Sequence, residues 1–145
     1  MQRIDLNIHK KTAGGEKALV VDDNPVVRQE VSGVLLSLGF AVCGAADTGH
    51  EAIELAKQLE PDLIFLDFSM PWMNGLQAAP ELRKIAPKTR IVLLTMYGSE
   101  LPQSEAEVRG VDLVASKTEN LHSVVSKARN LLKSRAERRT SPANV

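Results

Sequence analysis

The sequence predicts a doubly wound α/β domain built from five parallel strands, each followed by a helix. Short apolar runs of strand length alternate with segments whose apolar residues recur at helical spacing. The connections between them are short and rich in Gly, Pro, Asp and Asn. The central run, residues 63–66, is apolar at every position, as in a strand buried on both faces, and it ends on Asp67. Such alternation favours a parallel sheet covered by helices on both faces through right-handed crossovers.

Five strands are expected from these apolar runs. They comprise residues 18–21, 40–44, 63–67, 90–95 and 111–115. Each is short, and the flanking turn residues separate it from the next helical segment.

Start and stop signals delimit the first three helices. Pro25 suits the first turn of one helix and Gly39 its end. Thr48 is expected to cap the start of the second helix. The third helix follows Asn74, and Pro80 within its apolar pattern predicts a kink or a later start.

The remaining segments complete the predicted domain. Residues 99–109 contain few packing residues, so a short, weakly anchored helix is expected there. The last helix is strongly amphipathic and is expected to run to Lys133 or beyond. We therefore divide the chain into a flexible leader (1–16), one domain (17–134) and a polar, basic tail (135–145).

Composition limits the classes of function. The 145 residues fit one domain, and 18 basic and 18 acidic residues give no global charge to attract nucleic acid or acidic membranes. No apolar run approaches the roughly 18 residues of a membrane span, and the polar start lacks a signal-peptide core, so a cytoplasmic location is predicted. The single cysteine, Cys43, agrees, and the three scattered histidines disfavour a zinc site.

Polar residues end or directly follow four of the five predicted strands. They are Asp22, Asp23, Asp67, Thr95 and Lys117. Each could be an ordinary turn or cap residue by itself. Because parallel strands deliver their carboxyl ends to one edge of the sheet, all five are expected to converge there. Together they favour a functional site.

The chemistry of this set indicates phosphoryl transfer. Clustered carboxylates repel one another unless a cation is present, and oxygen ligands without cysteine or histidine suit Mg²⁺. The hydroxyl of Thr95 and the ammonium of Lys117 suit the oxygens of a phosphoryl group. Asp67 could itself attack phosphorus and form an aspartyl phosphate.

The chain also resembles the receiver domains of two-component response regulators, over about residues 17 to 133. The matching segments are Val20-Val21-Asp22-Asp23-Asn24, Leu66-Asp67-Phe68-Ser69-Met70-Pro71-Trp72-Met73-Asn74-Gly75, Leu94-Thr95 and Ser116-Lys117. The resemblance implies a flavodoxin-like sheet of strand order 2-1-3-4-5. It implies that Asp67 is the phosphoacceptor for a sensor histidine kinase or a histidine phosphotransfer protein.

The resemblance also implies roles for the other site residues. Asp23 and Asp67, with the main-chain carbonyl of Ser69, would hold Mg²⁺, and Asp22 would act mainly through water. Thr95 and Lys117 would contact the phosphoryl group. The implied output is a downstream protein bound at the face of the helix in residues 99–109, the last strand and the last helix.

Three departures from the family pattern predict an altered switch. Val114 stands where Tyr or Phe is usual, Thr118 stands where Pro is common, and Met96-Tyr97 replaces small residues. We therefore expect activation to appear mainly in the loop after Thr95 and in residues 99–109. By resemblance, Ser69 and Tyr97 flank the approach of water to the phosphoryl group.

Other functions stay open at this point. An interaction-only pseudo-receiver shares the fold, and the chain could be the receiver half of a DNA-binding regulator, with DNA as a partner only through an output domain outside this chain. A homodimer is compatible with each of these. An aspartyl phosphohydrolase is disfavoured because Ser69 stands where its second acid is expected, and a flavin module because Asp22 and Asp23 would repel the flavin phosphate. As a receiver, the chain is expected to be a signalling phosphoacceptor and not an enzyme.

Overall fold

The computed structural model describes residues 15–96 and 101–140, with side chains described as far as Lys133. It contains a five-stranded parallel sheet of order β2-β1-β3-β4-β5, which confirms the predicted architecture and strand order. The strands are β1 (Lys17–Val21), β2 (Ala41–Ala46), β3 (Leu63–Asp67), β4 (Arg90–Thr95) and β5 (Leu113–Ser116). The helices are α2 (Pro25–Ser37), α3 (Gly49–Leu59), α4 (Gly75–Ile85), α5 (Gln103–Val108) and α6 (Leu121–Thr140).

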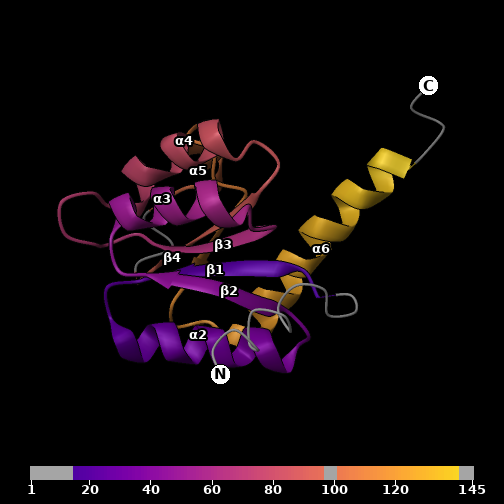
Figure 1. Ribbon diagram of the computed structural model, residues 1–145, viewed down its shortest axis with the longest axis horizontal. Helices are drawn as coiled ribbons and strands as arrows, with labels where there is room; N and C mark the ends of the chain where they lie inside the picture. Colours follow the sequence, from indigo (N-terminus) through magenta and orange to yellow (C-terminus); the bar gives the residue numbers. More distant parts are fainter. Residues whose placement is uncertain (1–14, 97–100, 141–145) are drawn as a thin grey trace.

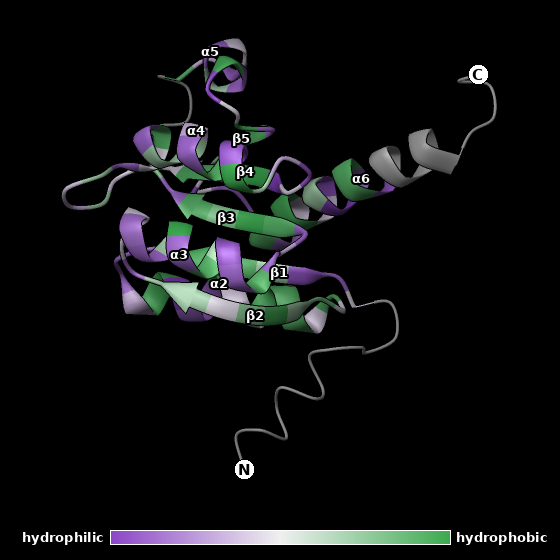
Figure 2. Cartoon of the chain, turned by 45° about the horizontal axis from the view of Figure 1, so that its top comes forward, coloured by the Kyte–Doolittle hydropathy of each residue, from purple (hydrophilic) through white to green (hydrophobic). Residues whose placement is uncertain are grey.

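Helices cover both faces of the sheet, with α2 and α6 on one side and α3, α4 and α5 on the other (Figure 1). A hydrophobic core lies on each face of the sheet, and the central strand β3 contributes to both because its side chains point alternately to the two faces. Leu63 and Phe65 pack with α2 and α6, whereas Ile64 and Leu66 pack with α3 and α4. All four are fully buried, and each contributes about 1.5–3 kcal/mol by leaving water. Accordingly, β3 is apolar along most of its length in Figure 2, while the helices alternate between polar and apolar.

The register of β3 brings the strand ends together. Its Leu66 pairs with Val21 of β1, and Asp67 pairs with Leu94 of β4. Asp22, the residue after Val21, therefore ends up beside Asp67 across one strand spacing of about 4.8 Å. Topology alone thus places two acids from distant parts of the chain side by side.

The predicted helix starts are confirmed where a side chain caps the helix. The Oγ1 of Thr48 accepts the main-chain N–H of Glu51 at 3.1 Å. Asn74 and Gln77 form a reciprocal capping box at the start of α4, with bonds of 2.8 and 2.9 Å. Because this box fixes the start of α4 at Gly75, the alternative of a later start at Pro80 is wrong.

Some predicted boundaries differ from the structure. Strand β2 runs from Ala41 to Ala46, two residues beyond its predicted end. Strand β5 begins at Leu113. The preceding Asp112 uses its side chain to accept bonds from two arginines and the N–H of Ile91.

Helix α5 is shorter than predicted, whereas α6 runs beyond Lys133, as the prediction allowed. Helix α5 spans only Gln103–Val108, because Pro102 takes the N-cap position and lacks a cap side chain. Residues 99 and 100 of the segment predicted as 99–109 lie outside the described residues. Helix α6 continues to Thr140, past the predicted domain end at 134, and projects from the body of the domain (Figure 1).

Candidate functional site

Lys117 connects two carboxylates at the carboxyl edge of the sheet. Its Nζ lies 2.8 Å from Oδ1 of Asp67 and 3.0 Å from Oδ2 of Asp22. Both carboxylates are almost fully buried, with side-chain exposures of 2% and 3%. The main-chain N–H of Lys117 donates to the carbonyl of Thr95 at 2.8 Å, which ties the end of β5 to the end of β4. The lysine is therefore positioned by the sheet as well as by its charge.

Asp22 is held by its own turn. Its Oδ1 accepts the N–H of Asn24 at 2.9 Å, and its main-chain carbonyl accepts Nη1 of Arg28 at 2.7 Å. Asn24 in turn caps α2 by accepting the N–H of Val26 at 2.9 Å. The acid is thus fixed by the same residues that start the helix.

The arrangement of acids fits a divalent cation. Asp22, Asp23 and Asp67 each offer a carboxylate oxygen within 4.8 Å of the others. Oδ2 of Asp67 is buried and accepts no hydrogen bond. Three carboxylates and one ammonium leave two negative charges when all are ionised, and every ligand atom is a hard oxygen. An unpartnered buried oxygen in such a cluster is what a bound Mg²⁺ would satisfy.

Burial and charge shift the pKa values in this cluster. Burial, the largest cause, raises the pKa of Asp67 and the hydrogen bond from Lys117 lowers it; with the charge of Asp22, which also raises it, the result is a pKa of about 6. Burial alone would lower the pKa of Lys117, but its bonds to Asp67 and Asp22 outweigh burial and raise it. The lysine is therefore charged at neutral pH, and ionisation of Asp67 is costly without a cation.

A close backbone approach shapes the loop after Asp67. A Cβ atom on Gly75 would lie 2.4 Å from the main-chain oxygen of Asp67 and 2.6 Å from Cδ1 of Leu93. Glycine is therefore needed at the first position of α4. The N–H of Gly75 donates to the carbonyl of Phe68 at 2.8 Å, so the loop closes tightly next to the acid.

The other predicted site residues lie along the same edge. Thr95 ends β4 and is 5% exposed. Ser69 is exposed, and its N–H donates to Oδ1 of Asp67 at 3.2 Å. Tyr97, predicted to flank the approach, lies outside the described residues.

Sequence reasoning missed two features of the site. It assigned Lys117 to the phosphoryl group alone, whereas the lysine also pairs with both aspartates. It also missed the close approach of Gly75 to the backbone of Asp67. A lysine and an aspartate both predicted at the same sheet edge are the signal that could have indicated the ion pair.

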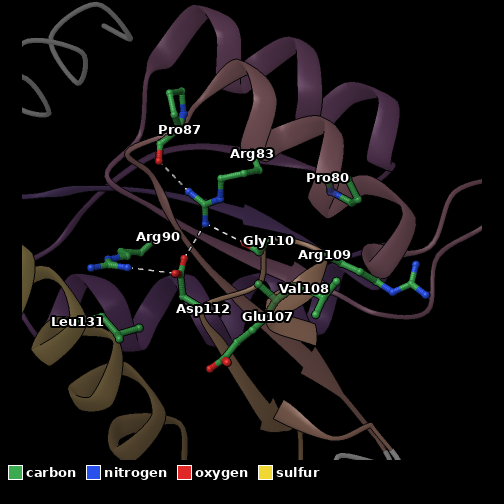
Figure 3. Close-up of a pocket in the computed structure, with 11 residues that line it drawn as sticks. Pro80, Arg83, Pro87, Arg90, Glu107, Val108, Arg109, Gly110, Asp112 and Leu131 are labelled. Carbon is green, nitrogen blue, oxygen red and sulfur yellow. Dashed lines mark hydrogen bonds and ion pairs between the residues drawn. The ribbon is translucent and has the colours of Figure 1, made fainter. Parts of the chain in front are cut away.

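A cavity of about 880 Å³ is lined by residues that include Arg90 at the start of β4 and Asp112 just before β5 (Figure 3). Because the acids lie where strands end, the cavity is at the opposite edge of the sheet. Arg83 projects into it and donates to the carbonyls of Pro87 and Gly110 at 3.0 and 2.8 Å. It also pairs with Asp112 at 2.7 Å, and Arg90 pairs with the same acid at 3.0 Å. The guanidinium groups of Arg83 and Arg90 thus bind groups of the protein itself. We call Arg83, Arg90 and Asp112 the clamp, because their bonds join α4, β4 and the segment before β5.

Comparison with protein families gives one match that covers most of the chain. A family model described as the response regulator receiver domain matches residues 18–129. The chain is 36% identical over 92 residues to the chemotaxis protein CheY of Thermotoga maritima, covering 63% of this chain and 77% of CheY. It is 39% identical over 95 residues to the nitrate/nitrite response regulator NarL of Escherichia coli, covering 65% of this chain and 44% of NarL. The matched part is thus less than half of that relative.

Solved structures agree with this match. The signal receiver domain of a response regulator named NarL from Mycobacterium tuberculosis superposes with a TM-score of 0.75 at 30% identity, covering 83% of this chain and 98% of that one. A response regulator of the LuxR family from an Aurantimonas species superposes with a TM-score of 0.77 at 25% identity, covering 83% of this chain and 87% of that one. In the part of the chain that the structure describes, no helix is long and apolar enough to cross a bilayer.

Proposed function

This chain belongs to the response regulator receiver family of two-component signalling, and on that premise we propose that it accepts a phosphoryl group on Asp67. The observation that carries the proposal is that the two oxygens of this carboxylate differ in their partners. Oδ1 is held by Lys117 and the N–H of Ser69, whereas Oδ2 is buried without a partner. The donor is a phosphohistidine on a sensor kinase or a phosphotransfer protein.

The transfer step is a displacement at phosphorus. An oxygen of Asp67 attacks the phosphorus atom, an O–P bond forms, and the N–P bond of the phosphohistidine breaks. The imidazole leaves with the electron pair of that bond. The ammonium of Lys117, already 2.8 Å from Asp67, lies within reach of the transferred oxygens, and the hydroxyl of Thr95 is a second donor for them.

Mg²⁺ fits the acids at this edge. We propose that Asp23, Asp67 and the main-chain carbonyl of Ser69 hold it, and that Asp22 acts mainly through water. When bound, Mg²⁺ neutralises charge on the phosphoryl oxygens. The cluster of Asp22, Asp23 and Asp67 oxygens and the orphaned Oδ2 support this assignment.

Phosphorylation by a small donor tests the proposal. With acetyl phosphate and Mg²⁺, intact mass should show one phosphoryl group per chain. Asp67→Asn and chelation of the metal should each abolish it, while Asp47→Asn, at an exposed site on another loop, should leave it unchanged. Robust labelling of Asp67→Asn at the same stoichiometry would refute the acceptor. A parent protein that never labels would favour an interaction-only pseudo-receiver.

We propose that the output face is formed by α5, β5 and α6. Val108 on α5 is 86% exposed, which leaves an apolar side chain available on this face. Val108→Asp should weaken phosphorylation-dependent association with a downstream protein, or with an output domain like those of the longer relatives, without slowing phosphorylation. The chemistry required is limited to the phosphorylation and dephosphorylation of the chain itself.

A further inference from the structure

The loop after the acceptor holds a tryptophan in a strained conformation. Trp72 has a φ of 65°, in the left-handed region that favours glycine. The N–H of Met73 donates to the carbonyl of Pro71 at 2.7 Å, so the chain makes a γ-turn centred on Trp72. The positive-φ form of this turn is rare and strained. The indole is 85% exposed, so burial of the ring does not offset that strain.

Both ends of this loop are anchored. Met70 is only 8% exposed and packs in the core, and the sulfur of Met73 lies 2.8 Å from where a Cβ on Gly49 would be. The capping box at Asn74 fixes the start of α4 directly after the turn. The loop is therefore a fixed support that holds the ring of Trp72 in solvent.

Two further apolar side chains are exposed in the segments that follow strands at this edge. Among the described residues, the exposed large hydrophobics are Val26, Leu36, Trp72, Met96 and Val108. Val26 lies five residues after the end of β1, Trp72 five after the end of β3, and Met96 directly after the end of β4. Three of the five thus belong to the segments that leave the sheet around Asp67.

We propose that Trp72 is the principal docking anchor for the protein that donates the phosphoryl group to this chain, with Val26 and Met96 completing the apolar contact. This inference rests on the proposed function. Asp67 is 1% exposed and lies at the base of these segments, so a protein donor must seat its phosphohistidine on this edge. A small donor needs no such seating. An exposed aromatic on a fixed support loses little conformational freedom on binding, which suits an anchor residue.

The test compares two kinds of donor. The probes are acetyl phosphate and the autophosphorylated histidine kinase that transfers fastest to the parent protein. Trp72→Gly removes the ring and relieves the positive φ, so the variant should be at least as stable as the parent. Its transfer rate from the kinase should fall by about tenfold at subsaturating concentration, as for an anchor residue, with its rate from acetyl phosphate unchanged.

Matched variants separate docking from other effects. Trp72→Phe should keep most of the transfer rate, and Leu36→Ala, at an exposed apolar side chain away from this edge, should leave it unchanged. Because Trp72 is the only tryptophan, its emission should shift to the blue when the kinase binds.

The inference is overturned if Trp72→Gly accepts the phosphoryl group from the kinase at the parent rate, or if its phosphorylation slows equally with both donors. It is also overturned if the emission shifts only with the concentration of the chain itself, or if acetyl phosphate labels the parent but no histidine donor does. Failure of acetyl phosphate to label the parent would instead refute the proposed function.

Discussion

Lys117 donates to the same oxygen of Asp67 that accepts the N–H of Ser69, and it leaves the other oxygen without a partner. The two oxygens of one buried carboxylate therefore differ in availability before any ligand binds. The lysine also spans the gap to Asp22, so its charge offsets the repulsion between two acids on neighbouring strands.

Lys117→Met should destabilise the magnesium-free protein by about 3–5 kcal/mol, because two buried carboxylates lose their shared cation. Saturating Mg²⁺ should recover part of this loss. Lys127→Met is a matched control, since Lys127 pairs with Glu119 at 3.5 Å on the exposed surface and should cost less than about 1 kcal/mol. Chemical denaturation with and without Mg²⁺ checks this, and equal losses in the two variants would contradict it.

The raised pKa of Asp67 predicts a pH-dependent stability. A carboxyl group whose folded pKa lies above its unfolded value of 3.8 stabilises the fold when protonated, and this contribution is lost as pH rises through about 6. Without Mg²⁺, Asp67→Asn should therefore gain stability relative to the parent between about pH 4 and pH 7.5, by up to about 3 kcal/mol. Mg²⁺ should reduce this difference in stability because it favours the ionised form of Asp67. If the difference in stability between Asp67→Asn and the parent did not change with pH, the raised pKa of Asp67 would be contradicted.

Two glycine substitutions should act in opposite directions. Gly75→Ala places a Cβ against the carbonyl oxygen of Asp67 and should cost about 1–3 kcal/mol, with slower phosphorylation because the acceptor backbone shifts. Gly33→Ala lies inside α2 with no atom within 4 Å of the new Cβ, and should stabilise by about 0.5–1 kcal/mol. Thermal unfolding and labelling rates of the pair check this. A neutral Gly75→Ala would show that the backbone there can move freely.

The clamp at the far edge should affect stability without affecting chemistry. Arg83→Met removes the bonds to Pro87, Gly110 and Asp112 and should cost about 2–3 kcal/mol, since the acid and carbonyls lose a charged donor. Arg109→Ala should change stability by less than about 0.5 kcal/mol, because this exposed side chain makes no hydrogen bond or ion pair with the described residues. Acetyl phosphate should label both variants at the parent rate. A large loss of labelling in Arg83→Met would link the two edges.

Activation should appear in α5. This helix has six residues, only Ala106 is buried, and no side chain caps its start. Poorly anchored elements open at low cost, and Val114 lacks the bulk of the aromatic side chain usual at its position. Hydrogen exchange with beryllium fluoride and Mg²⁺, compared with Mg²⁺ alone, should change most at α5 and the loop before it. Changes confined to the core of β4 and β5 would argue for a different switch.

Local patterns in the sequence were enough to predict the architecture and the edge of the sheet at which Asp22 and Asp67 meet. Apolar runs of strand length and helical periodicity depend only on neighbouring residues, and caps such as Thr48 and Asn74 act within one turn. Once the strands are parallel, Asp22 and Asp67 must meet at one edge.

Contacts between segments distant in the sequence could be seen only in the folded structure. The two ion pairs of Lys117 join residues from three strand ends, and the need for glycine at position 75 arises from the backbone of Asp67. The exposure of Trp72 likewise follows from the seating of Met70 in the core and of Met73 against Gly49 on either side of it. Such contacts depend on how separate elements pack in three dimensions, which the period of apolar residues along the chain does not encode.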